Sequence, residues 1–130
     1  MKPILLPLLL CASLFAADGY KIYEQHCASC HMVMLPLNEP ERGLQKAKMK
    51  APTMRMVSMR LKMMIHIHNE DEDIQRKVVK AFIKEYIDDP DEDYVLCLPE
   101  MVEKFGVMTP VKGLTHAQKE AVAEWLWEQF

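Results

Sequence analysis

The sequence lacks a long apolar run, and it lacks an excess of positive charge. Its longest apolar stretch lies at the start of the chain, is interrupted by Pro3 and Pro7, and is shorter than the about 20 residues of a membrane-spanning helix. The 16 basic residues stand against 19 acidic ones and form no basic stripe. These absences argue against a membrane-spanning protein and exclude nucleic-acid binding as a class of function.

Regular patterns that would indicate other classes of protein are also absent. No stretch alternates apolar and polar residues for long enough to require a β-sheet, and no internal repeat is present. Among four cysteines there is one Cys-x-x-Cys pair, Cys27 and Cys30, with no second pair to complete a structural zinc site. The sequence therefore gives no indication of a β-sheet, a repeat architecture or a structural zinc site.

The first 16 residues are typical of a secretory signal peptide. Lys2 is followed by a short apolar run and by small residues that end before Asp18. We expect cleavage after Ala16, with an uncleaved membrane anchor as the alternative. Residues 17–130 would then form a single domain with 15 basic and 19 acidic residues, a mildly acidic balance.

The most informative stretch is Cys27-Ala28-Ser29-Cys30-His31. Two cysteines separated by two residues and followed directly by histidine form the attachment signature of a c-type haem. The two thiols add to the two vinyl groups of the porphyrin, so they must project from about one helical turn. The next residue can then bind the iron, which makes His31 the expected proximal ligand. A thioredoxin-like dithiol needs no such histidine and expects a βαβ setting.

The residues before this motif predict a helix over about 19–27. Asp18 is a suitable N-cap. Gly19, Tyr23 and Cys27 recur at intervals of four, and a glycine in this position permits close approach of another element.

The end of the chain predicts a partner for that helix. Thr115 and Gln118 have the spacing of a capping box, and the helix they open carries Val122, Trp125 and Leu126 on one apolar stripe. We expect the two terminal helices to cross, with Trp125 beside Gly19 and Tyr23.

These features together resemble the class I c-type cytochromes. That family opens with a Gly-x-x-x-aromatic-x-x-x-Cys-x-x-Cys-His helix, here running from Gly19 to His31, and closes with an aromatic-Leu helix, here at Trp125-Leu126. The resemblance implies crossed N- and C-terminal helices around one covalently bound haem. Its closest matches cover 18–31 and 107–130, with looser similarity at 51–54 and 74–90.

The resemblance also implies the remaining haem contacts. The sixth ligand in the family is a methionine shortly before the last helix, which matches Met108, with Pro110 two residues on. Met101 is the next candidate. The proline loop of the family matches Pro52, whose carbonyl would accept the proton of the His31 ring, with Pro36 as a fallback.

The middle of the chain, about 55–107, is longer than in small family members. A helix through Ile74, Val78, Val79, Phe82, Tyr86 and Ile87 is expected to stop at Asp88–Pro90, and its second half resembles the third core helix of the family. A short helix from Glu100 to Phe105, ended by Gly106, should follow.

A methionine- and histidine-rich stretch begins this middle segment. Thioether and imidazole ligands suit copper, so a copper-handling protein is one alternative. The other interpretation is a helix or turn that packs flexible apolar side chains over the haem. The residues concerned are Met54, Met56, Met59, Met63, Met64, His66 and His68.

Other residues have two interpretations each. Arg55 or Arg60 could pair with a haem propionate, or be merely solvated. Cys97, between Leu96 and Leu98, is interpreted as a buried small hydrophobe, with a disulfide to a partner as the alternative. The acidic run 88–93 is predicted to be a solvated turn that could steer a basic partner.

The sequence thus predicts a single-haem, all-α cytochrome c of the periplasm. As an electron carrier rather than an enzyme, it would pass one electron between membrane and periplasmic redox enzymes, as a monomer, with no nucleic-acid partner and no stable membrane insertion. The alternative haem protein has an open or displaceable sixth position, for gas sensing or peroxidase-like chemistry, with His66 or His68 over the iron.

Overall fold

The computed structural model describes residues 17–67 and 71–130, and all regular elements within these ranges are helical. The predicted signal segment and His68 lie outside the described residues. The helices are α1 (Gly19–His26), α2 (Glu41–Ala47), α3 (Met54–Met64), α4 (Glu72–Asp88), the 3-10 helix η1 (Glu92–Tyr94), α5 (Pro99–Phe105) and α6 (His116–Gln129). The predicted all-α class is confirmed.

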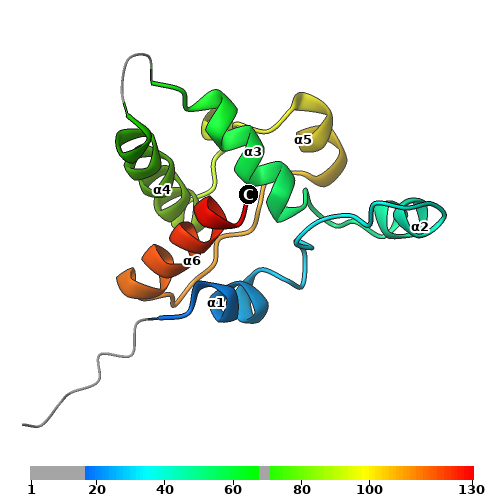
Figure 1. The fold of residues 1–130 in the computed structure, drawn as a ribbon, viewed down its shortest axis with the longest axis horizontal. Coiled ribbons are helices and arrows are strands. Elements are labelled where there is room, and N and C mark those ends of the chain that lie inside the picture. Colours follow the sequence, from blue (N-terminus) through cyan, green and yellow to red (C-terminus); the bar gives the residue numbers. More distant parts are fainter. Residues whose placement is uncertain (1–16, 68–70) are drawn as a thin grey trace, which may run out of the picture.

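Helices α1 and α6, from the two ends of the described chain, pack against each other as predicted (Figure 1). Gly19 is buried in this contact. A Cβ atom at this position would lie 2.5 Å from the Cβ of Trp125 and closer still to the carbonyl oxygen of Ala121, so no larger residue fits. The ring of Trp125 stacks on Tyr23 with 4.8 Å between centroids. A glycine is therefore what lets the two helix backbones meet.

Helix α6 is the central element, in contact with α1, α3 and α4. Thr115 and Gln118 form the predicted capping box at its start. Its buried residues are Val122, Ala123, Leu126 and Trp127. Trp127 was missed by the single-stripe prediction, because a helix with neighbours on three sides buries a wider arc than one stripe.

Helix α4 lies beside α6 and ends at Asp88, before Pro90, as predicted. Its predicted apolar face was partly wrong. Ile74 and Val78 are 36% and 40% exposed, whereas Val79 is only 2% exposed. The buried stripe continues from Val79 at intervals of four, so Ile74 and Val78 fall beyond its edge.

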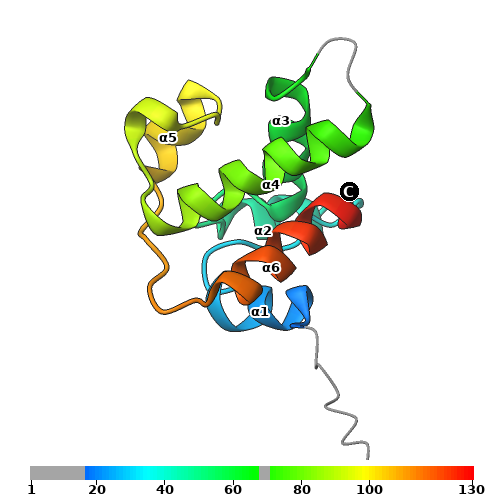
Figure 2. The same ribbon diagram turned by 90° about the vertical axis from the view of Figure 1, so that its left-hand side faces the viewer.

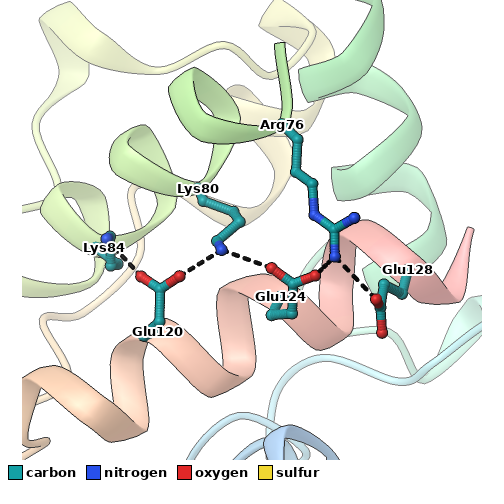
Figure 3. Close-up of polar contacts among 6 residues, drawn as sticks. All are labelled: Arg76, Lys80, Lys84, Glu120, Glu124 and Glu128. Carbon is teal, nitrogen blue, oxygen red and sulfur yellow. Dashed lines mark hydrogen bonds and ion pairs between the residues drawn. The ribbon is translucent and has the colours of Figure 1, made fainter. Parts of the chain in front are cut away.

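A ladder of alternating charges joins the solvent side of α4 and α6 (Figure 3). The basic residues of α4 and the acidic residues of α6 each recur at intervals of four, so three turns of one helix face three turns of the other. Ion pairs link Arg76 to Glu124 and Glu128, Lys80 to Glu120 and Glu124, and Lys84 to Glu120. This ladder was not predicted from the sequence.

The remaining helices lie away from this core. Helix α2 was not predicted, buries none of its residues and extends outward on its own (Figure 1). Helix α5 matches the predicted short helix, with Gly106 ending it at a φ of 72°. It stands apart from α1 and α6 in both views (Figure 2). Among the described residues, none of the helices has the length and apolar character required to cross a bilayer.

Candidate cofactor-binding site

A cavity of about 550 Å³ opens between the helices. Its walls come from the turn after α1, the 50–52 loop, one side of α3, the second half of α4, the segments around α5, and α6. The lining is mostly apolar, with Leu61, Phe82, Ile83 and Leu126 among its residues. Its volume lies within the roughly 300–1,000 Å³ range of pockets that hold cofactor-sized ligands.

The Cys-x-x-Cys-His stretch enters this cavity directly from α1. The helix ends at His26, and residues 27–30 form a turn in which the amide of Cys30 donates to the carbonyl of Cys27 at 3.1 Å. The amide of His31 donates to the same carbonyl at 2.9 Å. Cys27, Cys30 and His31 all line the cavity. One turn therefore brings both thiols and the imidazole to a single apolar space.

The ring of His31 is oriented by a backbone carbonyl. Its Nδ1 atom lies 2.6 Å from the carbonyl oxygen of Pro52, and this oxygen can only accept, so Nδ1 carries the proton. The Nε2 atom is then the unprotonated one, with a lone pair for a metal. Burial lowers the pKa of His31 and outweighs the opposing effect of the Pro52 hydrogen bond, which keeps the ring neutral near pH 7.

The hydrogen bond predicted between His31 and Pro52 is confirmed, and the fallback to Pro36 was wrong. The carbonyl of Pro36 instead accepts from Nη1 of Arg42 at 3.4 Å. Pro52 is placed by the segment beside it. The amide of Met54 donates to the carbonyl of Met32 at 2.8 Å, so the start of α3 is held against the chain that follows His31.

Two candidate thioether ligands line the same cavity. Met108 belongs to the segment between α5 and α6 and packs against the hydrophobic core, and Met101 belongs to α5. Both were singled out from the sequence, and the cavity contains both together with His31. The ranking of Met108 over Met101 stays a prediction.

Burial raises the pKa of two of the cysteine thiols, those of Cys27 and Cys97. Burial raises the pKa of the Cys27 thiol to about 11, and the neighbouring Cys30 raises it further. Cys97 is half-buried rather than fully buried, lines the cavity, and has a pKa raised by burial. The interpretation of Cys97 as a packed small side chain is thus right in kind, and its position beside the cavity was not predicted.

Several sequence candidates are not brought to the cavity. Arg55 is exposed and His66 is exposed, and neither lines it. Arg60 does line the cavity, and its Nε donates to the carbonyl of Leu96 at 2.8 Å. The cavity therefore supports Arg60, and not Arg55, as the candidate partner of an anionic group.

The packing interpretation of the methionine-rich stretch was right for one residue and wrong for three. Met54 is buried and lines the cavity. Met59, Met63 and Met64 are about half exposed or more and are not among its lining residues. The helical phase of α3 explains the difference, because Met54 shares the inward face with Ser58 and Leu61.

Sequence reasoning missed residues that hold or border the site. The hydroxyl of Tyr23 donates to the carbonyl oxygen of His31 at 2.7 Å. Lys50 and Lys112 contribute positive charge to the cavity lining. The role of Tyr23 could have been predicted from its position one turn before Cys27. Nothing in the sequence distinguishes Lys50 and Lys112 from the other lysines.

The chain is similar to a protein found by comparison with curated sequences. An uncharacterized protein of Aquifex aeolicus (strain VF5) is 33% identical over an alignment of 144 residues, which covers 100% of this chain and 89% of the relative. No family model matches the chain, and no solved structure matches it at a significant level.

Proposed function

The chain belongs to the same family as the Aquifex aeolicus protein, and we propose that it is a single-haem c-type cytochrome that carries electrons. One observation carries this proposal. Cys27, Cys30 and His31, which have the spacing of the haem-attachment signature, line one apolar cavity of cofactor size together with Met108. The crossed α1 and α6 helices agree with the fold that the class I cytochrome resemblance implies.

The residues present fit a covalently bound haem. Cys27 and Cys30 would hold it through thioether bonds, and His31 would bind the iron through Nε2, since Nδ1 is committed to Pro52. The Pro52 carbonyl fixes the tautomer of the ring and makes it a more basic ligand. Met108 would supply a thioether ligand, and Arg60 would face the anionic edge of the porphyrin.

The haem, when bound, supplies a one-electron couple between ferric and ferrous iron. The chain's own residues set the conditions for that couple. The mostly apolar lining would favour the reduced haem, which carries less charge than the oxidised haem, and a thioether ligand raises the reduction potential relative to harder ligands. The hydrogen bonds to Tyr23 and Pro52 hold His31 at its backbone and at its ring, which would limit its reorientation when the iron changes oxidation state.

The location and partners follow from the same proposal. A c-type haem is attached outside the cytoplasm, so the chain would be exported to the periplasm by its first 16 residues. It would exchange electrons with membrane and periplasmic redox enzymes, through the small interfaces that are typical of redox encounters. The carrier acts without chemistry of its own on a substrate, so it is not an enzyme in this proposal.

The optical spectrum of the full chain, exported by a bacterium that can attach c-type haem, tests this function. We expect covalently bound haem with a low-spin spectrum in both oxidation states, a weak long-wavelength sulfur–iron band in the ferric form, and no response to carbon monoxide. Absence of covalent haem would overturn the proposal. A high-spin ferric form or rapid carbon monoxide binding would replace the carrier by the alternative with an open sixth position.

Two variants identify the sixth ligand. Met108→Ala should abolish the sulfur–iron band and lower the potential, whereas Met101→Ala, which removes the other thioether of the cavity, should leave both unchanged. The opposite pattern would assign the iron to Met101. A Cys27→Ser, Cys30→Ser variant should lose the covalent haem and serves as the control for attachment.

A further inference from the structure

One wall of the cavity stands outside the helix packing of the core. Helix α6 packs against α1, α3 and α4, and among the described residues α5 is not part of this packing (Figure 2). The segment 95–108, which includes α5, nevertheless contributes much of the lining and carries both candidate thioether ligands, Met101 and Met108. The position of these thioethers in the cavity therefore depends on what fastens this wall to the rest of the protein.

The wall is fastened at its two ends. At its start, the Nε atom of Arg60 on α3 donates to the carbonyl oxygen of Leu96 at 2.8 Å. Beyond its end, the amide of Val111 donates to the carbonyl of Ile87 on α4 at 2.9 Å. Within the described chain, the hydrogen bonds of residues 97–107 all lie inside the segment itself. The attachment at the start of the wall therefore depends on one side chain.

Arg60 has donors for the wall and for the cavity at once. Its Nε atom is committed to Leu96, and among the described residues no group accepts a hydrogen bond from its two Nη atoms. Because Arg60 also lines the cavity, these donors remain for an anionic group inside it. Its closeness to the wall is also evident at Cys97, where burial raises the pKa of the thiol and the positive charge of Arg60 lowers it.

We propose that Arg60 is a positioning residue, which holds the thioether-bearing wall of the cavity against α3 through the carbonyl of Leu96. The inference rests on the proposed function, since the wall affects the iron only where one of its methionines is the sixth ligand. Without the bond from Arg60, the segment is free at its start and opens about its attachment at Val111, so the thioether leaves the iron more often. An external ligand then binds the iron with an apparent affinity that rises with the open fraction.

Two neutral substitutions separate this hydrogen bond from the charge of Arg60. Arg60→Gln places an amide nitrogen at the point of the side chain where arginine has Nε, so it keeps a donor for Leu96. Arg60→Leu has no donor. Arg55→Leu is the matched control, because Arg55 is exposed on the same helix and does not line the cavity. Glutamine and leucine are both good helix formers, so α3 itself is preserved in all three variants.

Hydrogen exchange of the full exported chain, followed by mass spectrometry, measures the wall directly and does not require haem. Amides of residues 97–107 should exchange about fivefold faster in Arg60→Leu, as expected for the loss of one hydrogen bond. They should exchange at the wild-type rate in Arg60→Gln and Arg55→Leu, and the amides of α1 and α6 should be unchanged throughout. The proposal is overturned by unchanged exchange in Arg60→Leu, by an equal increase in Arg60→Gln, or by a general increase that includes α1 and α6.

Imidazole titration of the ferric, haem-loaded chain measures the consequence for the iron. Followed through loss of the sulfur–iron band, imidazole should bind about fivefold more tightly to Arg60→Leu than to the wild type, and Arg60→Gln should match the wild type. Equal affinities for all variants would contradict a positioning role toward the iron. A wild-type chain without covalent haem would overturn the proposed function and leave the exchange result standing, so the two failures are distinguishable.

Discussion

The hydroxyl of Tyr23 donates a hydrogen bond to the carbonyl oxygen of His31, at 2.7 Å. Tyr23 is 4% exposed and stacks on Trp125 of α6, so its position is fixed by the contact between the two terminal helices. His31 is therefore held twice, by Tyr23 at its backbone and by Pro52 at its ring. The packing of α1 on α6 and the orientation of the candidate iron ligand are parts of one arrangement.

Removing this hydroxyl should loosen that arrangement. Tyr23→Phe keeps the ring stacking and leaves the carbonyl of His31 with one partner fewer, at a cost of about 1 kcal/mol in the free energy of unfolding. Urea denaturation followed by circular dichroism measures it. Tyr20→Phe, at a ring that is 45% exposed, is the control and should change stability by only a few tenths of that. Equal effects of the two variants would mean that the bond to His31 contributes nothing.

Gly19→Ala should be strongly destabilising. The new Cβ would overlap the carbonyl of Ala121 and lie 2.5 Å from the Cβ of Trp125, so the helices must separate, at about 3 kcal/mol or more. Gly43→Ala is the matched control, because its Cβ meets only the flexible Glu39 side chain, at 3.1 Å. That control should be neutral or stabilising by up to about 1 kcal/mol, through higher helix propensity. Thermal unfolding of both variants measures this difference in stability, and equal stability of the two would contradict the prediction.

The ladder between α4 and α6 should make stability depend on acid. Hydrogen bonds from Lys80 and Lys84 lower the pKa of Glu120 from 4.5 to about 2. A carboxylate with a lowered pKa in the folded state stabilises above its unfolded pKa, and this contribution is lost as the pH falls from about 4.5 towards 2. Because the Glu120 side chain is 39% exposed, solvent screening limits the contribution to about 1 kcal/mol.

Glu120→Gln tests this dependence. The variant should be less stable than the wild type at neutral pH, and the difference should disappear as the pH approaches 2. Glu128→Gln, at a side chain that is 62% exposed, should have a smaller effect over the same range. A Glu120→Gln difference that stays constant from neutral pH down to 2 would rule out the ladder as its source.

Lys62 should stabilise the end of α6. Its Nζ atom donates to the carbonyl oxygens of Trp127, at 2.8 Å, and Phe130, at 2.6 Å, and lies 4.3 Å from the centroid of the Trp127 ring. Lys62→Met keeps the apolar stem and removes a cation from a helix C-terminus, at about 1–2 kcal/mol. Lys77→Met, on the exposed side of α4, should have almost no effect. Chemical denaturation of both variants measures their free energies of unfolding, and equal losses would contradict this role of Lys62.

Local signals in the sequence predicted much of the fold because they depend on neighbours in the chain. The N-cap at Asp18, the capping box at Thr115 and the stop before Pro90 each arise within a few residues, and each is present. The contact of Gly19 with Trp125 was predictable as well, since a glycine at a helix surface and an apolar stripe both indicate close packing. The His31–Pro52 hydrogen bond was anticipated only through the family resemblance.

Features that depend on how helices are placed were missed. Trp127 is buried because α6 has α1, α3 and α4 around it, which no periodicity in α6 alone reveals. The charge ladder requires α4 and α6 to lie in register, and the sequence shows only that each helix has charges at intervals of four. The division of the methionines between cavity and solvent follows from the rotation of α3, which is set by Met54 and Leu61.

The packing of α1 against α6 also constrains when the protein can fold. During synthesis or export from the N-terminus, the turn with Cys27 and Cys30 emerges while most of the chain, including α6, is still to follow. The apolar face of α1 has no partner until α6 arrives, so the two thiols are present before the cavity that they line is closed. Closure of the fold then waits for the last helix, so the cavity wall that α6 supplies is completed last.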